Sequence, residues 1–237
     1  MMSKKNYKNI FTVACVKEEW PTYLKLHLEN KDLIKQVEKK EDLLAFIYCD
    51  EQLKKTRIEK VEGYNNVINV TLPISESYKT LSKKTYETIK YFYENFSFEF
   101  LFKGDITKLI ELNIFDLGLT EKNPKDYIGC SAFKARKNRA GFFQHQGLSK
   151  AMQPCRKKSF KKWATKRGLE VNEWLFDDSV YFSSWKPYAV SNKFAKIISN
   201  YGERYVNLYL EELGGCEDHM IGKIWKDLSI AYDLKIR

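Results

Sequence analysis

Short apolar runs along the first half of the chain have the length of buried β-strands. Three of them span residues 10–16, 43–49 and 67–72. Because these runs are continuous rather than alternating, they are typical of strands covered on both faces, as in a parallel sheet. A fourth run, residues 98–102, is rich in phenylalanine and breaks off at Lys103. We therefore expect four core strands in this half.

Helical periodicity occupies intervals between these runs. Over residues 78–96, apolar side chains recur three and four positions apart, and we expect the lysines among them, including Lys84, to face away from the core. Ser75 is the expected N-cap of this helix. A second helix is expected to begin at Pro21, which suits a first helical turn. The order β-α-β-β-α-β predicts a mostly parallel sheet with helices on its faces.

The second half of the chain has fewer clear elements. Residues 127–130 form a candidate short strand. Ser191 is the expected cap of a helix that we expect to end at Gly202. A further helix is expected to begin at Glu217 and Asp218, with apolar residues at helical spacing through residue 228.

A length of 237 residues fits one large globular domain or two small ones, and of these we expect a single α/β domain covering residues 1–237. Hydrophobic residues make up 43% of the chain and aromatic residues 15%, which is unlike a disordered protein. No apolar stretch reaches the length that a membrane-spanning helix requires. The polar N-terminus is followed by no apolar h-region, so a signal peptide is not expected. The five cysteines are scattered without CxxC spacing, which favours reduced thiols and a cytoplasmic location.

Positive charge is unevenly distributed along the chain. The formal net charge is +10, and residues 134–167 contain many Lys and Arg but no acidic residue. One interpretation is a solvated lysine-rich face. The other is a surface for an anion: nucleic acid, an anionic membrane face contacted peripherally, or a phosphorylated substrate.

A few polar residues stand where chemistry is often found. Asp105 follows a glycine at the end of an expected buried strand, where open α/β sheets place ligand groups. A simple Gly-Asp turn is the alternative. Glu217 and Asp218 begin an expected helix, and capping alone could explain them. His145 is a candidate catalyst, although a histidine in such a loop is more often not catalytic.

Three blocks in order resemble the β-1,3-galactosyltransferase/Fringe-like family of inverting glycosyltransferases. ESYKTLSKK at residues 76–84 is similar to the family's D-x-Y-x-N-L-T-x-K. FLFKGDIT at residues 100–107 is similar to its strand ending in K-x-D-D-D, and EDHMIG at residues 217–222 to its E-D-V-x-x-G. A weaker fourth block ends in YAVS at residues 188–191 and is similar to G-x-G-Y-x-L-S.

The resemblance implies a GT-A fold with a nucleotide-sugar half, about residues 1–110, and an acceptor half, about residues 111–237. It implies transfer of a hexose, with inversion, from a nucleotide sugar, usually a UDP-sugar. The acceptor would be a hydroxyl of a glycan, glycolipid or other anionic molecule. Mn²⁺ or Mg²⁺ would hold the diphosphate. The residues it assigns to the donor site are Tyr78, Lys84, Lys103 and Asp105.

The resemblance also implies Asp105 as the metal ligand and Asp218 as the catalytic base, with Glu217 as its competitor. Inverting transfer needs a base for the acceptor proton and a cation for the departing diphosphate. The chain departs from the family pattern where Ile106 and Thr107 replace two acids of the triplet, and where Trp185 and Pro187 replace glycines.

Two other functions are compatible with the sequence. One is an inactive homologue that binds a sugar nucleotide without turnover. Another is a basic nucleic-acid-binding protein, although no RNP, KH, helix-turn-helix or zinc-finger pattern occurs, so a nucleic-acid partner is not expected. Should neither Asp218 nor Glu217 act as the base, His145 and His219 are the next candidates.

Overall fold

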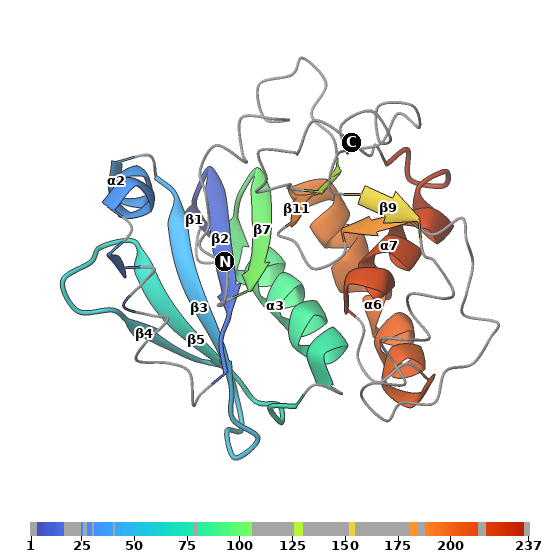
Figure 1. The fold of residues 1–237 in the computed structure, drawn as a ribbon, viewed down its shortest axis with the longest axis horizontal. Coiled ribbons are helices and arrows are strands. Elements are labelled where there is room, and N and C mark those ends of the chain that lie inside the picture. The colour runs from blue at the N-terminus through green and yellow to red at the C-terminus, as the bar shows by residue number, and fades with distance from the viewer. Residues whose placement is uncertain are drawn as a thin grey trace.

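The computed structural model describes residues 4–16, 25, 28–29, 31–39, 41–77, 80–105, 126–129, 152–154, 181–183, 188–212 and 217–234. Within them, a seven-stranded sheet in the order β4-β5-β3-β2-β7-β11-β8 forms the centre of the fold (Figure 1). Helices pack against it. The predicted α/β class with a largely parallel sheet is confirmed.

Four neighbouring strands of this sheet run parallel to one another: β5 (Val67–Leu72), β3 (Leu43–Cys49), β2 (Asn9–Ala14) and β7 (Phe100–Asp105). Antiparallel strands extend the sheet at both sides. β4 (Arg57–Lys60) pairs with β5 at one edge, and β11 (Tyr188–Ser191) lies between β7 and β8 (Tyr127–Gly129) at the other. Strands from both halves of the chain therefore build one sheet.

The described residues also form two small sheets beside the large one. β1 (Lys5–Asn6) pairs in parallel with β6 (Phe96–Ser97), and β9 (Met152–Pro154) pairs antiparallel with β10 (Tyr181–Ser183).

Helices cover both faces of the central sheet. α3 (Leu81–Asn95), α6 (Asn192–Glu212) and α7 (Glu217–Leu228) pack against one another and share one core with one face of the strands (Figure 1). α2 (Lys31–Lys39) contributes Val37 to the core on the opposite face. In β2, Ile10 belongs to the first core and Phe11 to the second. Burial on both faces explains the continuous apolar runs. Among the described residues, no helix has the length and apolar character needed to cross a membrane.

The strand predicted at residues 98–102 begins two residues later and ends three residues later. β7 begins at Phe100 and continues through Lys103, Gly104 and Asp105, which pair in register with the last residues of β2. Backbone pairing with a parallel neighbour holds these residues in the strand although they are not apolar. The prediction that the strand ends before Lys103 was wrong.

The start of α3 also differs from the prediction. The helix begins at Leu81, preceded by Thr80, and Ser75 is not its N-cap. Instead, the backbone carbonyl of Ser75 accepts a hydrogen bond from Thr80 Oγ1 at 2.8 Å. Of the helix expected after Pro21, only residues 25 and 28–29 lie in the described part of the chain.

Ser191 caps α6 as predicted, since its Oγ accepts a hydrogen bond from the Phe194 backbone N–H at 3.1 Å. The helix does not end at Gly202, however, and continues to Glu212. A Cβ atom at position 202 would lie 2.7 Å from the Tyr86 ring of α3. The glycine therefore permits close packing of two helices, which a sequence pattern cannot distinguish from a helix end.

Gly202→Ala is expected to destabilise the protein by about 1–3 kcal/mol, although alanine favours a helix, because the new methyl group overpacks the contact with Tyr86. Urea unfolding measures the change. Asn207→Ala, on the exposed side of the same helix, is the control and should leave stability unchanged or slightly higher. Equal stability of the Gly202→Ala variant and the parent protein would contradict the packing explanation.

Candidate functional site

The order of the parallel strands reverses at β2. From β2 the chain builds β3 and then β5 on one side, and it returns to place β7 on the other side. Ligands of open α/β sheets bind outside the carboxyl ends of the strands at such a switch point. The carboxyl ends of β2 and β7 lie side by side, with Ala14 paired to Asp105. We call this region the switch-point edge.

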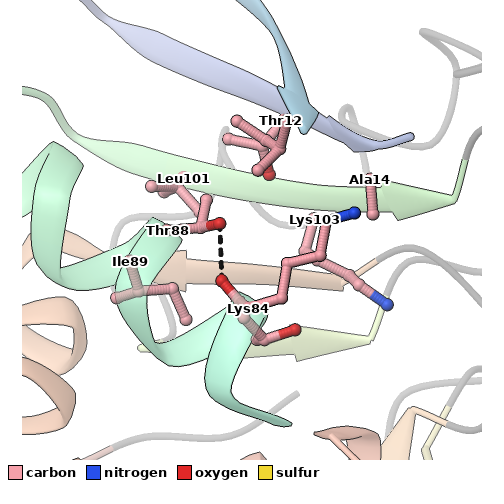
Figure 2. A pocket seen from close by; sticks show the side chains of 9 residues that line it. Thr12, Ala14, Lys84, Thr88, Ile89, Leu101 and Lys103 are labelled. Atoms are coloured by element: carbon pink, nitrogen blue, oxygen red, sulfur yellow. Dashed lines mark hydrogen bonds between the residues drawn. The ribbon is translucent and has the colours of Figure 1, made fainter. Parts of the chain in front are cut away.

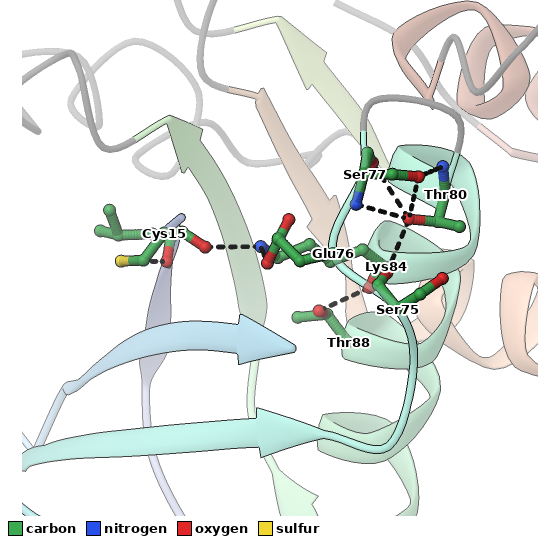
Figure 3. Close-up of polar contacts among 8 residues, drawn as sticks. Cys15, Ser75, Glu76, Ser77, Thr80, Lys84 and Thr88 are labelled. Atoms are coloured by element: carbon green, nitrogen blue, oxygen red, sulfur yellow. Dashed lines mark hydrogen bonds and ion pairs between the residues drawn. The ribbon is translucent and has the colours of Figure 1, made fainter. Parts of the chain in front are cut away.

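Lys84 of α3 reaches the switch-point edge and is buried there. Its Nζ donates hydrogen bonds to the backbone carbonyl of Cys15, at 2.6 Å, and to Glu76 Oε2, at 2.7 Å (Figure 3). Only 3% of Lys84 is exposed, so the prediction that it faces away from the core was wrong. A buried ammonium group requires such partners. Cys15 is 69 residues away from Lys84 in the sequence, and Glu76 lies in the segment that precedes α3. Lys84 thus ties the end of β2 to the segment that precedes α3.

That segment has its own hydrogen-bonded turn. Ser77 and Thr80 bond reciprocally, because the backbone N–H of each donates to the hydroxyl oxygen of the other (Figure 3). Thr80 Oγ1 also donates to the carbonyl of Ser75. The turn fixes the residues on both sides of Glu76 and so holds its carboxylate beside Lys84.

Lys103 of β7 joins the same edge to the start of α7. Its Nζ lies 2.6 Å from Glu217 Oε1 and 3.9 Å from Asp218 Oδ1. All three side chains are largely buried, with exposed fractions of 14%, 11% and 15%. The two acids occupy the first turn of α7, where the helix dipole also stabilises negative charge. Lys103 therefore holds Glu217 more tightly than Asp218.

A small cavity separates the two lysines. Its volume is about 10 Å³, and its lining includes Thr12 and Ala14 of β2, Lys84 and Thr88 of α3, and Lys103. Figure 2 shows both lysine side chains extending in the direction in which β7 ends. The lining is mainly apolar, with Ile47, Ile89 and Leu101 among its residues, and a cavity of this size has room for one water molecule at most. Any ligand larger than a water molecule would have to lie outside this cavity.

The thiols of Cys15 and Cys49 are buried near this edge. Burial is the main cause that raises the pKa of Cys15 to about 12, and it does the same for Cys49. Nearby Lys84 lowers both values only in part. Because the thiolate is the nucleophile, neither cysteine suits covalent catalysis at neutral pH.

Four of the residues selected from the sequence thus meet at one edge: Lys84, Lys103, Glu217 and Asp218. Asp105 ends β7 at this edge, but its side chain, like that of His219, lies outside the described residues. Tyr78 and His145 also lie outside them, as does the basic segment 134–167 except for the backbone of β9.

The ion-pair role of Glu76 and the burial of Tyr188 were not predicted. Glu76 stands at the first position of the ESYKTLSKK block, and Tyr188 matches the tyrosine of the weaker fourth block, so both blocks gave a signal.

The described residues do not form a metal-binding site by themselves. Among them there is no group of three or more His, Cys, Asp or Glu side chains that could hold a metal ion. Glu217 and Asp218 already face an ammonium group. No protein-family model matches the chain, and no curated protein matches it significantly.

Proposed function

We propose that the protein is an inverting glycosyltransferase with a GT-A-type fold, similar to the β-1,3-galactosyltransferase/Fringe-like family. It would move a hexose from a UDP-sugar to a hydroxyl of a glycan or glycolipid. The observation that carries the proposal is the convergence of Lys84, Lys103, Glu217 and Asp218 at the switch-point edge. These residues come from the three separate sequence blocks that carry the resemblance.

The side chains at this edge suit the proposed displacement. The acceptor oxygen attacks the anomeric carbon, the bond from that carbon to the diphosphate oxygen breaks, and UDP departs with the electron pair. Asp218 takes the acceptor proton as general base. The ammonium groups of Lys84 and Lys103 lie close enough to the strand ends to offset negative charge on the diphosphate. Glu217 keeps Lys103 in place before the donor binds.

Asp105 is the proposed metal contact because it ends the strand at the switch point. One carboxylate is enough where diphosphate oxygens and waters complete the shell of Mg²⁺ or Mn²⁺. Asp105→Ala is therefore expected to lose Mn²⁺-dependent binding of UDP while keeping its unfolding temperature, as measured by titration calorimetry.

The matched control for that variant is Asp50→Ala. Asp50 directly follows β3, two strands away from β7, and its carboxylate accepts a hydrogen bond from the Gln52 backbone N–H. This variant should bind UDP as the parent protein does. Unchanged UDP and Mn²⁺ affinity in Asp105→Ala would remove Asp105 from the site.

Donor hydrolysis tests the proposed function directly. The protein is incubated with UDP-galactose, UDP-glucose and UDP-N-acetylglucosamine, and released UDP is measured with and without Mn²⁺. Release of UDP from one donor above the rate in water is the expected result. Binding without release would favour the inactive homologue, and the absence of both binding and release would refute the proposal.

A further inference from the structure

The hydroxyl group of Tyr188 has no hydrogen-bond partner among the residues that the structure describes, although the residue is completely buried. Buried polar groups are nearly always paired, since leaving one unpaired costs stability. Proteins retain an unpaired buried polar group chiefly at sites where function requires it. The position of this hydroxyl therefore needs an explanation.

Tyr188 is a direct neighbour of Lys103, whose ammonium group faces Glu217 and Asp218. It lies opposite Lys103 in the antiparallel pair of β11 and β7, and its ring centre is 5.9 Å from Lys103 Nζ. Burial raises the pKa of Tyr188 well above its ordinary value, and the charges of Asp218, Tyr127 and Glu217 raise it further in that order. A raised pKa favours the protonated phenol, which can donate a hydrogen bond, and Lys103 lies next to both Tyr188 and the two acids of α7.

We propose that Tyr188 is a positioning residue for Asp218, an inference that rests on the proposed transferase function. In the protein without ligand, the Lys103 ammonium neutralises Glu217 and lies near Asp218. An anionic diphosphate at the switch-point edge attracts that ammonium. The Tyr188 hydroxyl then donates a hydrogen bond to the Asp218 carboxylate and holds it toward the acceptor hydroxyl.

Tyr188→Phe removes only the hydroxyl, and Tyr205→Phe is its matched control. Tyr205 is also buried, but its hydroxyl donates to Asp227 Oδ2 and accepts from Arg204 Nη2, both at 3.1 Å. Without ligand, Tyr205→Phe should lower the unfolding temperature by about 2–4 °C because it loses these bonds. Tyr188→Phe should leave that temperature unchanged or raise it.

Binding and turnover separate a positioning role from a structural one. Tyr188→Phe should bind UDP with the affinity of the parent protein, and the KM for the UDP-sugar should not change. Its kcat for UDP release should fall by about ten- to a hundredfold, since a misdirected base slows the chemical step. Tyr205→Phe should retain the parent rate.

Three outcomes would overturn the inference. A loss of stability in Tyr188→Phe equal to that in Tyr205→Phe would show that the hydroxyl is already bonded in the free protein. A parent-like kcat in Tyr188→Phe would show that the hydroxyl does not act on Asp218. Failure of the parent protein itself to bind UDP would refute the proposed function and this inference with it, and the parent measurement alone reveals that case.

Discussion

Asp218→Asn is expected to lower sugar transfer by roughly a hundredfold or more while UDP binding persists. General-base catalysis contributes about this much, and an amide cannot accept the acceptor proton. Asp218 is the better candidate of the acidic pair because Lys103 holds it less closely, at 3.9 Å against 2.6 Å for Glu217. The start of α7 gives it a rigid mount, as proton transfer requires. The measurement is the rate of UDP release under saturating donor, beside UDP affinity by calorimetry.

Glu217→Gln is the control for that prediction. It replaces the carboxylate that pairs most closely with Lys103, so we expect it to lower the unfolding temperature more than Asp218→Asn does. Its effect on transfer should be the smaller one. An inactive Glu217→Gln with a nearly unchanged Asp218→Asn would reverse the two roles. Activity in both variants would place the base elsewhere, with His145 and His219 as the next candidates.

Lys84→Met is expected to destabilise the protein by about 3 kcal/mol, which corresponds to a fall of roughly 6–12 °C in unfolding temperature. The variant removes the ammonium from two partners at once, the Glu76 carboxylate and the Cys15 carbonyl. In the Glu76 side chain, 22% of the surface stays exposed to water. Because water still hydrates the carboxylate, we expect the loss of stability to lie at the lower end of the range for breaking a buried ion pair.

Two controls distinguish the ion pair from the loss of a lysine in general. Lys83→Met, at the neighbouring position of α3, changes a half-buried lysine with the same change of charge and should have a small effect. The double variant Lys84→Met/Glu76→Leu should recover part of the lost stability, since an apolar pair leaves no buried carboxylate unpaired. If Lys84→Met unfolds at the same temperature as the parent protein, Lys84 does not hold the end of β2.

Apolar patterns predicted the core of the fold well. The runs at β3 and β5 coincide with the observed strands, because β3 is buried over its whole length and β5 at every residue except the half-buried Asn69. Local capping also worked at Ser191, whose partner is only three residues away. β4 was missed because all its residues are exposed at a sheet edge and it has no apolar run.

The site was only partly predictable because its contacts join distant parts of the chain. Lys84 looks like a surface lysine in its own helix, and its burial depends on Cys15, 69 residues away. Lys103 and Glu217 are 114 residues apart, so no local pattern pairs them. The resemblance selected these residues by type and order, but it could not give their partners. The YAVS block selected Tyr188 by residue type, but no sequence pattern shows how a hydroxyl is paired in the folded protein.

The central claim is that the switch-point edge binds a nucleoside diphosphate. Thermal unfolding of the parent protein with UDP tests this claim. UDP at a hundredfold excess over its Kd should stabilise the protein by about 2.7 kcal/mol. The expected result is a rise in unfolding temperature of several degrees with UDP and Mn²⁺, which is lost in Asp105→Ala and kept in Asp50→Ala. An unfolding temperature that does not change at millimolar UDP, with or without Mn²⁺, would contradict the claim.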